Sequence, residues 1–282
     1  MAVTELRTRP TLARYGWIGI GMVAVFWALN WLLPGVRTHL LFAPLWVGYA
    51  LTVDALVLLR TGTSILTRSR RDFILLFFVS APAWWIFEFL NDHTRNWEYL
   101  GHELFTSLEF NVYSTISFAT VLPAVFGSAE LLRSFRWMDG FATGPKLRPT
   151  RLMLWSCLLG GVSMLFLMLS YPRQAYPLMW LSVFFILEPI CYWLGKPCLF
   201  DRAQHGDWRT ITALWFGSLL CGLFWEMWNF YAFPKWIYHT PGVEFAKLFE
   251  MPLLGYLGYI PFGMELYVLT HLLLPYRPAL KI

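Results

Sequence analysis

The sequence predicts an all-α polytopic membrane protein, and two observations support that prediction. Of its 282 residues, 57% are apolar and only 14% are charged, whereas soluble domains usually carry about 25% charged residues. Several apolar runs are also about 20 residues long, which is the length a helix needs to cross a hydrocarbon core of roughly 30 Å. The net charge of +5 is accounted for by basic loops beside the membrane. Membrane lipid is therefore an expected partner, and nucleic acid is not.

The apolar runs predict eight membrane spans. Seventeen of the 22 Lys and Arg residues then lie on one side of the membrane and five on the other. The positive-inside rule places both termini in the cytoplasm and the protein in the cell (inner) membrane. The first run is interpreted as a retained anchor, because no small-residue cleavage site follows it. The spans are residues 16–34, 39–59, 72–91, 109–132, 152–171, 177–195, 210–231 and 251–274.

An internal duplication divides the chain into two four-span halves, roughly residues 1–145 and 146–282. Each half contains Glu-x-x-Asn followed six or seven residues later by Trp-x-Tyr. An acid also lies fourteen residues before an arginine in each half, and a glutamate and a proline recur downstream. An even number of spans per half predicts parallel repeats, related by an axis along the membrane normal. The matched residues are Asp54 and Glu188, Arg68 and Arg202, Glu88 and Glu226, Asn91 and Asn229, Trp97 and Trp236, Tyr99 and Tyr238, Glu109 and Glu250, and Pro123 and Pro261.

Six acids fall within the expected spans, where an unpaired charge costs about 2.5–3.5 kcal/mol or more. Residues three apart share a helix face, so Asn91 should orient Glu88 and Asn229 should orient Glu226. Two interpretations stay open. These acids are either interhelical hydrogen-bond partners, or protonated carboxyls that act as general acids in a dry site. The six are Asp54, Glu88, Glu130, Glu188, Glu226 and Glu265.

The surroundings of these acids allow two further expectations. Asp54 and Glu188 are predicted to form structural ion pairs with Arg68 and Arg202 near the cytoplasmic face. Glu226 is predicted to face an interior cavity shared with Glu265, in an apolar pocket for a ligand. Aromatic side chains would shape that pocket, although the Trp-x-Tyr segments also suit an interfacial belt. These side chains are Trp225, Trp228, Tyr231, Trp236 and Tyr238.

Several cofactor chemistries lack the residues they need, so neither a cofactor nor a metal is expected. No span contains a lysine, which excludes a retinal Schiff base. His39 and His271 lie at opposite ends of their spans and cannot be two axial ligands of one haem. The stretch "NDHTRN" lacks the second aspartate of a prenyltransferase motif, and neither a P-loop nor HExxH occurs. The four cysteines form no zinc spacing or disulfide framework.

The stretches "FWEMWNFYAFPKWIY" and "IPFGMELYVL" resemble the lycopene cyclase domain of bacterial and archaeal carotenoid cyclases. The resemblance covers about 50 residues, with a fainter copy at 84–132, and that family is also built from repeated halves. It implies that Glu226 takes the place of the first acid and Glu265 that of a glutamate pair, here reduced to one. Trp236 and Tyr238 take the place of the family's Trp-x-Tyr.

Two functions are compatible with these observations. In the first, the protein is a membrane enzyme acting on a long apolar isoprenoid. A carboxyl protonates an alkene, aromatic faces stabilise the carbocation, and a carboxylate removes the final proton. Glu226 and Glu265 would be the acid pair and Glu88 the symmetric partner. In the second, it is a non-enzymatic membrane protein: a lipid or pigment binder, a complex subunit or a proton-coupled carrier. The substrate and the oligomeric state are not determined by the sequence.

Overall fold

The computed structural model describes residues 11–282 and is mostly helical. Within these residues, seven helical segments are long and apolar enough to cross a membrane. They match the first seven expected spans, so the architecture is that of a multi-pass membrane protein. Arg7 and Arg9, which were counted toward the predicted topology, lie outside the described residues.

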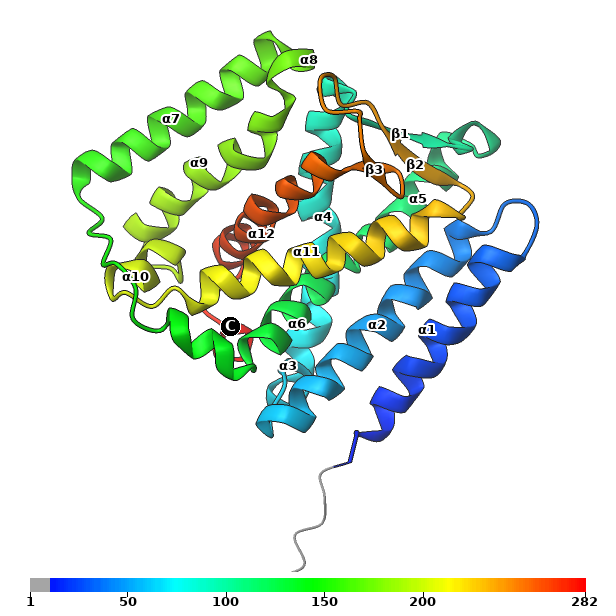
Figure 1. Ribbon diagram of the computed structural model, residues 1–282, viewed down its shortest axis with the longest axis horizontal. Coiled ribbons are helices and arrows are strands. Elements are labelled where there is room, and N and C mark those ends of the chain that lie inside the picture. The colour runs from blue at the N-terminus through cyan, green and yellow to red at the C-terminus, as the bar shows by residue number, and fades with distance from the viewer. Residues whose placement is uncertain (1–10) are drawn as a thin grey trace, which may run out of the picture.

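The N-terminal half of the chain forms helices joined by short connections (Figure 1). The fourth expected span is interrupted between Phe118 and Val121, so it consists of two helices. The elements are α1 (Arg14–Leu32), α2 (Thr38–Thr61), α3 (Ile65–Arg68), α4 (Arg70–Thr94), β1 (Trp97–Leu100), η1 (His102–Leu104), α5 (Ser107–Phe118), α6 (Val121–Arg133) and η2 (Arg136–Phe141).

The C-terminal half has a similar order of elements with an additional short hairpin. They are α7 (Arg151–Ser170), α8 (Pro172–Ala175), η3 (Tyr176–Leu178), α9 (Met179–Trp193), α10 (Leu199–Gln204), α11 (Arg209–Phe230), β2 (Lys235–Tyr238), β3 (Lys247–Leu248), β4 (Met251–Pro252), η4 (Leu253–Gly258), α12 (Tyr259–Leu273) and η5 (Pro278–Leu280).

The eighth expected span, residues 251–274, differs from the structure. Its α-helix, α12, has only 15 residues, about 22 Å at 1.5 Å per residue. The preceding residues form β4 and the 3₁₀ helix η4 instead. Pro252 stands at the start of η4 and Pro261 in the first turn of α12, positions at which proline is well tolerated because the missing N–H has no partner within the helix. The apolar run therefore overestimates the length of this helix.

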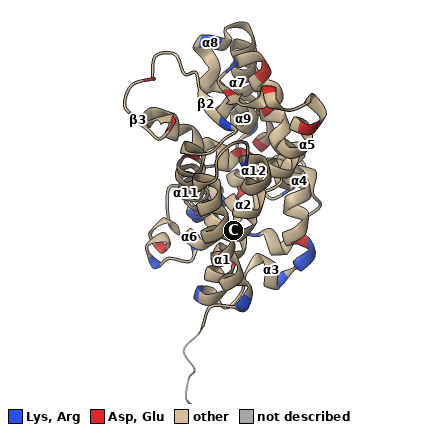
Figure 2. Cartoon of the chain, turned by 90° about the vertical axis from the view of Figure 1, so that its right-hand side faces the viewer, with Lys and Arg blue, Asp and Glu red and all other residues tan. Residues whose placement is uncertain are grey.

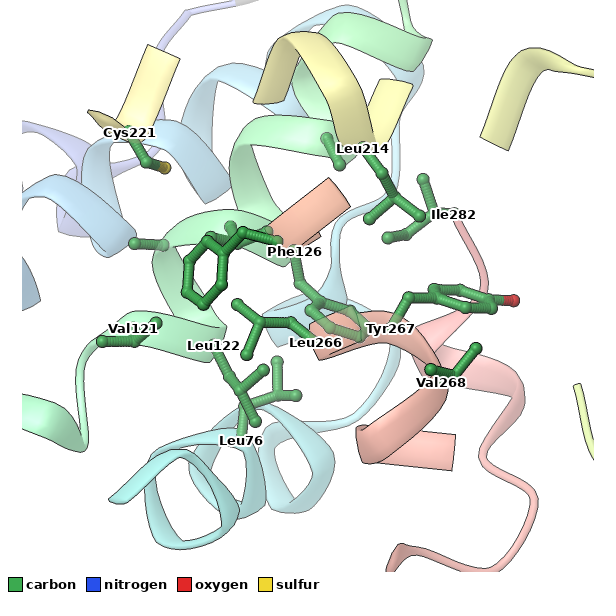
Figure 3. Packing of buried hydrophobic residues seen from close by; sticks show 14 of the residues in the cluster. Leu76, Val121, Leu122, Phe126, Leu214, Cys221, Leu266, Tyr267, Val268 and Ile282 are labelled. Atoms are coloured by element: carbon green, nitrogen blue, oxygen red, sulfur yellow. The ribbon is translucent and has the colours of Figure 1, made fainter. Parts of the chain in front are cut away.

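The core lies where α4, α6, α11 and α12 meet, and α6 is the most enclosed of these helices. Every residue from Val121 to Ala129 is buried, as expected for a helix that is apolar all round. Figure 3 shows Phe126 of α6 between Leu214 of α11 and Leu266 of α12, and its ring stacks on Tyr267 at 6.1 Å. Such packing between the halves fixes the positions of α11 and α12.

Two ends of the molecule differ in character. The basic end carries α3, α10, η2 and η5, and Figure 2 shows Lys and Arg gathered around α3 and the nearby ends of α1 and α6. The strand end carries β1, β2 and the loop with β3 (Figure 1). The C-terminus is held at the basic end, where the carbonyl of Ile282 accepts a hydrogen bond from Thr210.

Candidate site between the two Trp-x-Tyr strands

The two Trp-x-Tyr segments pair with each other as an antiparallel ribbon. The register places Trp97 opposite Tyr238, Glu98 opposite Ile237 and Tyr99 opposite Trp236. Each tryptophan therefore faces the tyrosine of the other strand. These strands are about 140 residues apart in the sequence, and their pairing closes the strand end of the molecule over the helices below.

Glu226 is buried in α11 and is stabilised by phenol groups rather than by a basic residue. The hydroxyl of Tyr238 donates to its Oε1 at 2.7 Å, and that of Tyr259 donates to the same atom at 2.8 Å. The indole of Trp236 in turn donates to the Tyr238 hydroxyl at 2.9 Å. A carboxyl can occupy this apolar helix because β2, which follows it, and the start of α12 supply its hydrogen bonds.

Glu88 has the corresponding environment in the first half. Its Oε1 accepts from the hydroxyl of Tyr99 at 2.5 Å and from the indoles of Trp84 and Trp97 at 2.7 and 3.2 Å. In both halves the tyrosine of the Trp-x-Tyr strand donates to the glutamate of the preceding helix. The recurring sequence unit is thus a recurring hydrogen-bonded unit.

The two asparagines hold the strands and do not contact the carboxyls. Asn91 accepts from the backbone amide of Trp97 and donates to its carbonyl. Asn229 makes the same two bonds with the backbone of Trp236, at 2.9 and 2.7 Å. A side-chain amide has a donor and an acceptor side by side, which matches one residue of a strand. The expected role in orienting Glu88 and Glu226 is therefore corrected.

The side chain four residues before each glutamate differs in size between the two halves. Trp84 lies four residues before Glu88, whereas Gly222 lies four residues before Glu226. A Cβ atom on Gly222 would approach the ring of Tyr259 to 2.4 Å. The tyrosine ring thus uses space that a side chain at 222 would need, and its hydroxyl replaces the Trp84 indole as a donor to the glutamate.

Beneath the strands lies an aromatic cavity of about 560 Å³, lined by residues of both halves. Fifteen of its 33 lining residues are Phe, Tyr or Trp, so its walls are largely apolar. Lys235 is the charged residue among them, and it pairs with Glu250. The donors to the two glutamates all line this cavity, and so does Trp236, which donates to the Tyr238 hydroxyl. The donors are Trp84, Trp97, Tyr99, Tyr238 and Tyr259.

The predicted pocket residues are only partly in this cavity. Trp225, Trp236 and Tyr238 line it, but Glu88 and Glu226 lie behind the aromatic wall. Trp228 is buried against Trp46 at 4.9 Å between ring centroids. Tyr231 is exposed, 5.0 Å from the ring of Trp31. Trp228 differs from the prediction because it packs among Trp46 and Tyr49 of α2, and Tyr231 because it lies just after α11 ends.

Glu265 does not share the cavity with Glu226, contrary to the prediction. It is fully buried in α12, and among residues 11–282 neither carboxyl oxygen has a hydrogen-bond partner. The backbone of Phe184 approaches it without the geometry of a hydrogen bond. A buried carboxyl without partners is far less costly when it carries its proton.

Asp54 and Glu188 hold short helices at the basic end instead of pairing with arginines. Asp54 accepts from the backbone amide of Leu66 at 3.0 Å, and Glu188 accepts from that of Phe200, twelve residues on in each case. Arg68 pairs with Glu130 at 2.5 Å, and no ion pair of Arg202 occurs within residues 11–282. The predicted ion pairs are corrected, because a backbone amide at a helix start is the nearer donor.

The phenol groups of the ribbon remain protonated. The pKa of Tyr238 is held well above its usual range, mainly by burial and secondly by the neighbouring Glu226 carboxyl. Burial and Glu88 do the same to the pKa of Tyr99. Both hydroxyls are therefore permanent donors at neutral pH.

Over the described part of the chain, no group of three His, Cys, Asp or Glu residues could hold a metal ion.

Comparison of the chain with protein-family models, with curated proteins and with solved structures finds no match in any of the three.

Proposed function

We propose that the protein is a cell-membrane protein that binds a long, apolar, isoprenoid-like molecule in the aromatic cavity. The observation that carries this proposal is the cavity itself: about 560 Å³ with largely aromatic walls, within the range of about 300–1,000 Å³ typical of ligand sites. The proposal includes both termini in the cytoplasm, and the basic loops of the sequence support this orientation.

A second candidate is proton-initiated chemistry on the bound molecule, as the resemblance to lycopene cyclases implies. It is favoured by phenol hydroxyls that line the cavity and are hydrogen-bonded to the buried Glu88 and Glu226. A protonated Glu226 would be the proton source: its proton would pass to the Tyr238 oxygen as the Tyr238 hydroxyl proton passes to an alkene, leaving a Glu226 carboxylate. The resulting carbocation would be stabilised by aromatic faces and would lose a proton to restore the acid.

The cavity is proposed to lie between two parallel repeats. The order α1, α2, α3, α4, β1, α6 recurs as α7, α9, α10, α11, β2, α12. The β1–β2 register pairs equivalent positions symmetrically, and the hydrogen bonds of Asn91 and Asn229 recur. These regularities support a two-fold relation, and ligands of repeated membrane folds often bind at the repeat interface.

Binding is tested by filling the cavity. Ser117 lines it, whereas Ser156 is exposed on α7. Ser117→Trp and Ser156→Trp variants would be titrated in detergent with geranylgeraniol, following quenching of tryptophan fluorescence. We expect Ser117→Trp to weaken binding at least tenfold and Ser156→Trp to bind like the wild type. Equal binding by both variants, or no binding to the wild type, would contradict the proposal.

Catalysis is tested separately in a lycopene-producing host. Glu226→Gln keeps the size and an acceptor oxygen but removes the titrating proton. If the acid takes part, product formation should fall by about a hundredfold, the usual scale for acid–base catalysis. A Gln variant that makes the same product at the same rate as an active wild type would exclude Glu226 from the chemistry.

A further inference from the structure

A second pocket of about 330 Å³ lies beside the aromatic cavity at the strand end. We call it the cationic pocket, because two arginines and a histidine line it. Its residues are Thr94, Arg95, Asn96, Arg173, Tyr176, His239 and Pro241. Asn96 and Tyr176 also line the aromatic cavity, so the two spaces adjoin.

The fold brings the two arginines together from distant parts of the chain. Arg95 follows the end of α4, where its amide bonds to the carbonyl of Asn91 and its Nε donates to that of Asp92. Arg173 lies in α8, directly after α7. The ring of His93 bonds to the carbonyl of Leu169 at 2.7 Å and so ties the end of α4 to the end of α7.

The cationic pocket has hydrogen-bond donors that the described residues do not use. Within residues 11–282, the terminal guanidinium nitrogens of Arg95 and the whole guanidinium of Arg173 make no hydrogen bond or ion pair. Thr94 is only 5% exposed, and among the described residues its buried hydroxyl has no hydrogen-bond partner. The carboxylate of Glu98 lies 3.1 Å from the ring of His239, so it offsets the positive charge of that imidazole when the imidazole is protonated. Among the residues that line the pocket, the two arginines, which stay charged at any physiological pH, give the lining its positive charge.

We propose that the ligand is an amphiphile whose phosphate headgroup binds in the cationic pocket while its apolar tail enters the aromatic cavity. Guanidinium groups bind phosphate oxygens through paired hydrogen bonds, and the Thr94 hydroxyl offers another donor. The pocket lies at the strand end, beside the ends of two candidate spans, Arg70–Thr94 and Arg151–Ser170. This inference rests on the proposed function and names the ligand class: a polyprenyl phosphate or an anionic phospholipid.

The test compares ligands that differ only in the headgroup. Full-length protein in a neutral detergent would be titrated with geranylgeranyl phosphate and with geranylgeraniol, by tryptophan fluorescence. We expect the phosphate to bind at least tenfold more tightly. In the Arg95→Gln/Arg173→Gln variant this advantage should disappear, while binding of the alcohol is unchanged. Lys247→Gln, which removes an exposed charge outside both pockets, should keep the advantage.

The outcomes separate the two proposals. If the wild type binds the alcohol and the phosphate equally, or if the double arginine variant keeps the preference, the headgroup inference is wrong while the aromatic cavity stands. If neither compound binds, the proposed function fails first. Competition by phosphatidylglycerol vesicles would assign the headgroup to a phospholipid, and its absence to a polyprenyl phosphate. Competition by inorganic phosphate alone would show that the headgroup supplies most of the affinity.

Discussion

At the scale of single residues, Glu226 shows how an apolar helix accommodates a carboxyl without a basic partner. Two phenol hydroxyls donate to the same oxygen, and both belong to segments that follow the helix. The hydrogen bonds are a property of the fold rather than of α11. Removing the Glu226 carboxyl therefore takes away an acceptor and also leaves two buried hydroxyl donors without a partner.

Replacing the carboxyl measures this contribution. Glu226→Ala would leave the hydroxyls of Tyr238 and Tyr259 buried without an acceptor, at about 1–3 kcal/mol for each such group. Glu226→Gln keeps an acceptor oxygen. We expect the Ala variant to lose several degrees of thermal stability in detergent and the Gln variant to unfold close to the wild type. Equal stability of Ala and wild type would show that these hydrogen bonds contribute little.

The neutral state of Tyr238 gives a pH prediction. A tyrosine of ordinary pKa, about 10, is largely ionised at pH 11, whereas burial and Glu226 raise the pKa of Tyr238 well above that value. The folded state keeps a proton that the unfolded state releases, so this group reduces stability as pH rises above about 10. Folded wild type and Tyr238→Phe should show equal phenolate absorbance at pH 11. A deficit of one phenolate in the variant would contradict the raised pKa.

At the scale of elements, the contact between α11 and α12 depends on a glycine. A Cβ on Gly222 would approach the Tyr259 ring to 2.4 Å, whereas nothing lies within 4 Å of a Cβ on Gly160 of α7. We expect Gly222→Ala to destabilise the protein by about 1–3 kcal/mol through overpacking, and Gly160→Ala to have little effect. Thermal unfolding compares them. In a Tyr259→Val background, Gly222→Ala should cost much less than in the wild type; an equal cost in both backgrounds would contradict this cause.

The pairing of β1 with β2 can be tested by cross-linking. Glu98 and Ile237 lie directly opposite each other, so cysteines at both positions should form a disulfide under mild oxidation. Mass spectrometry of the digested protein would detect the linked peptides. The pair Glu98→Cys/Lys247→Cys should stay unlinked, because Lys247 lies on β3 in another sheet. A control pair that links as readily as the test pair would show mobility rather than pairing.

At the scale of the whole molecule, the distribution of charge predicts the orientation in the membrane. The connection around residue 140 and the C-terminus both lie at the basic end (Figure 1). Reporter fusions at residue 140 and after residue 282 should both give cytoplasmic signals, because basic loops stay inside. A fusion at residue 243, in the loop at the strand end, is the matched control and should report the opposite side. A periplasmic signal at residue 140 would overturn the orientation.

The sequence alone determined the membrane class, seven of the spans and the recurrence of Glu-x-x-Asn with Trp-x-Tyr, because hydropathy, charge and spacing are local properties of the chain. It overestimated the last helix, where 3₁₀ and extended segments precede Tyr259. It could not determine that Asn91 and Asn229 bind backbone, that Arg68 pairs with Glu130, or that Arg95 and Arg173 share a pocket. Those contacts join residues that are distant in the sequence, or residues on either side of a tight turn after a helix. Only the packing of the helices decides which hydrogen-bonding groups come within about 3 Å of one another.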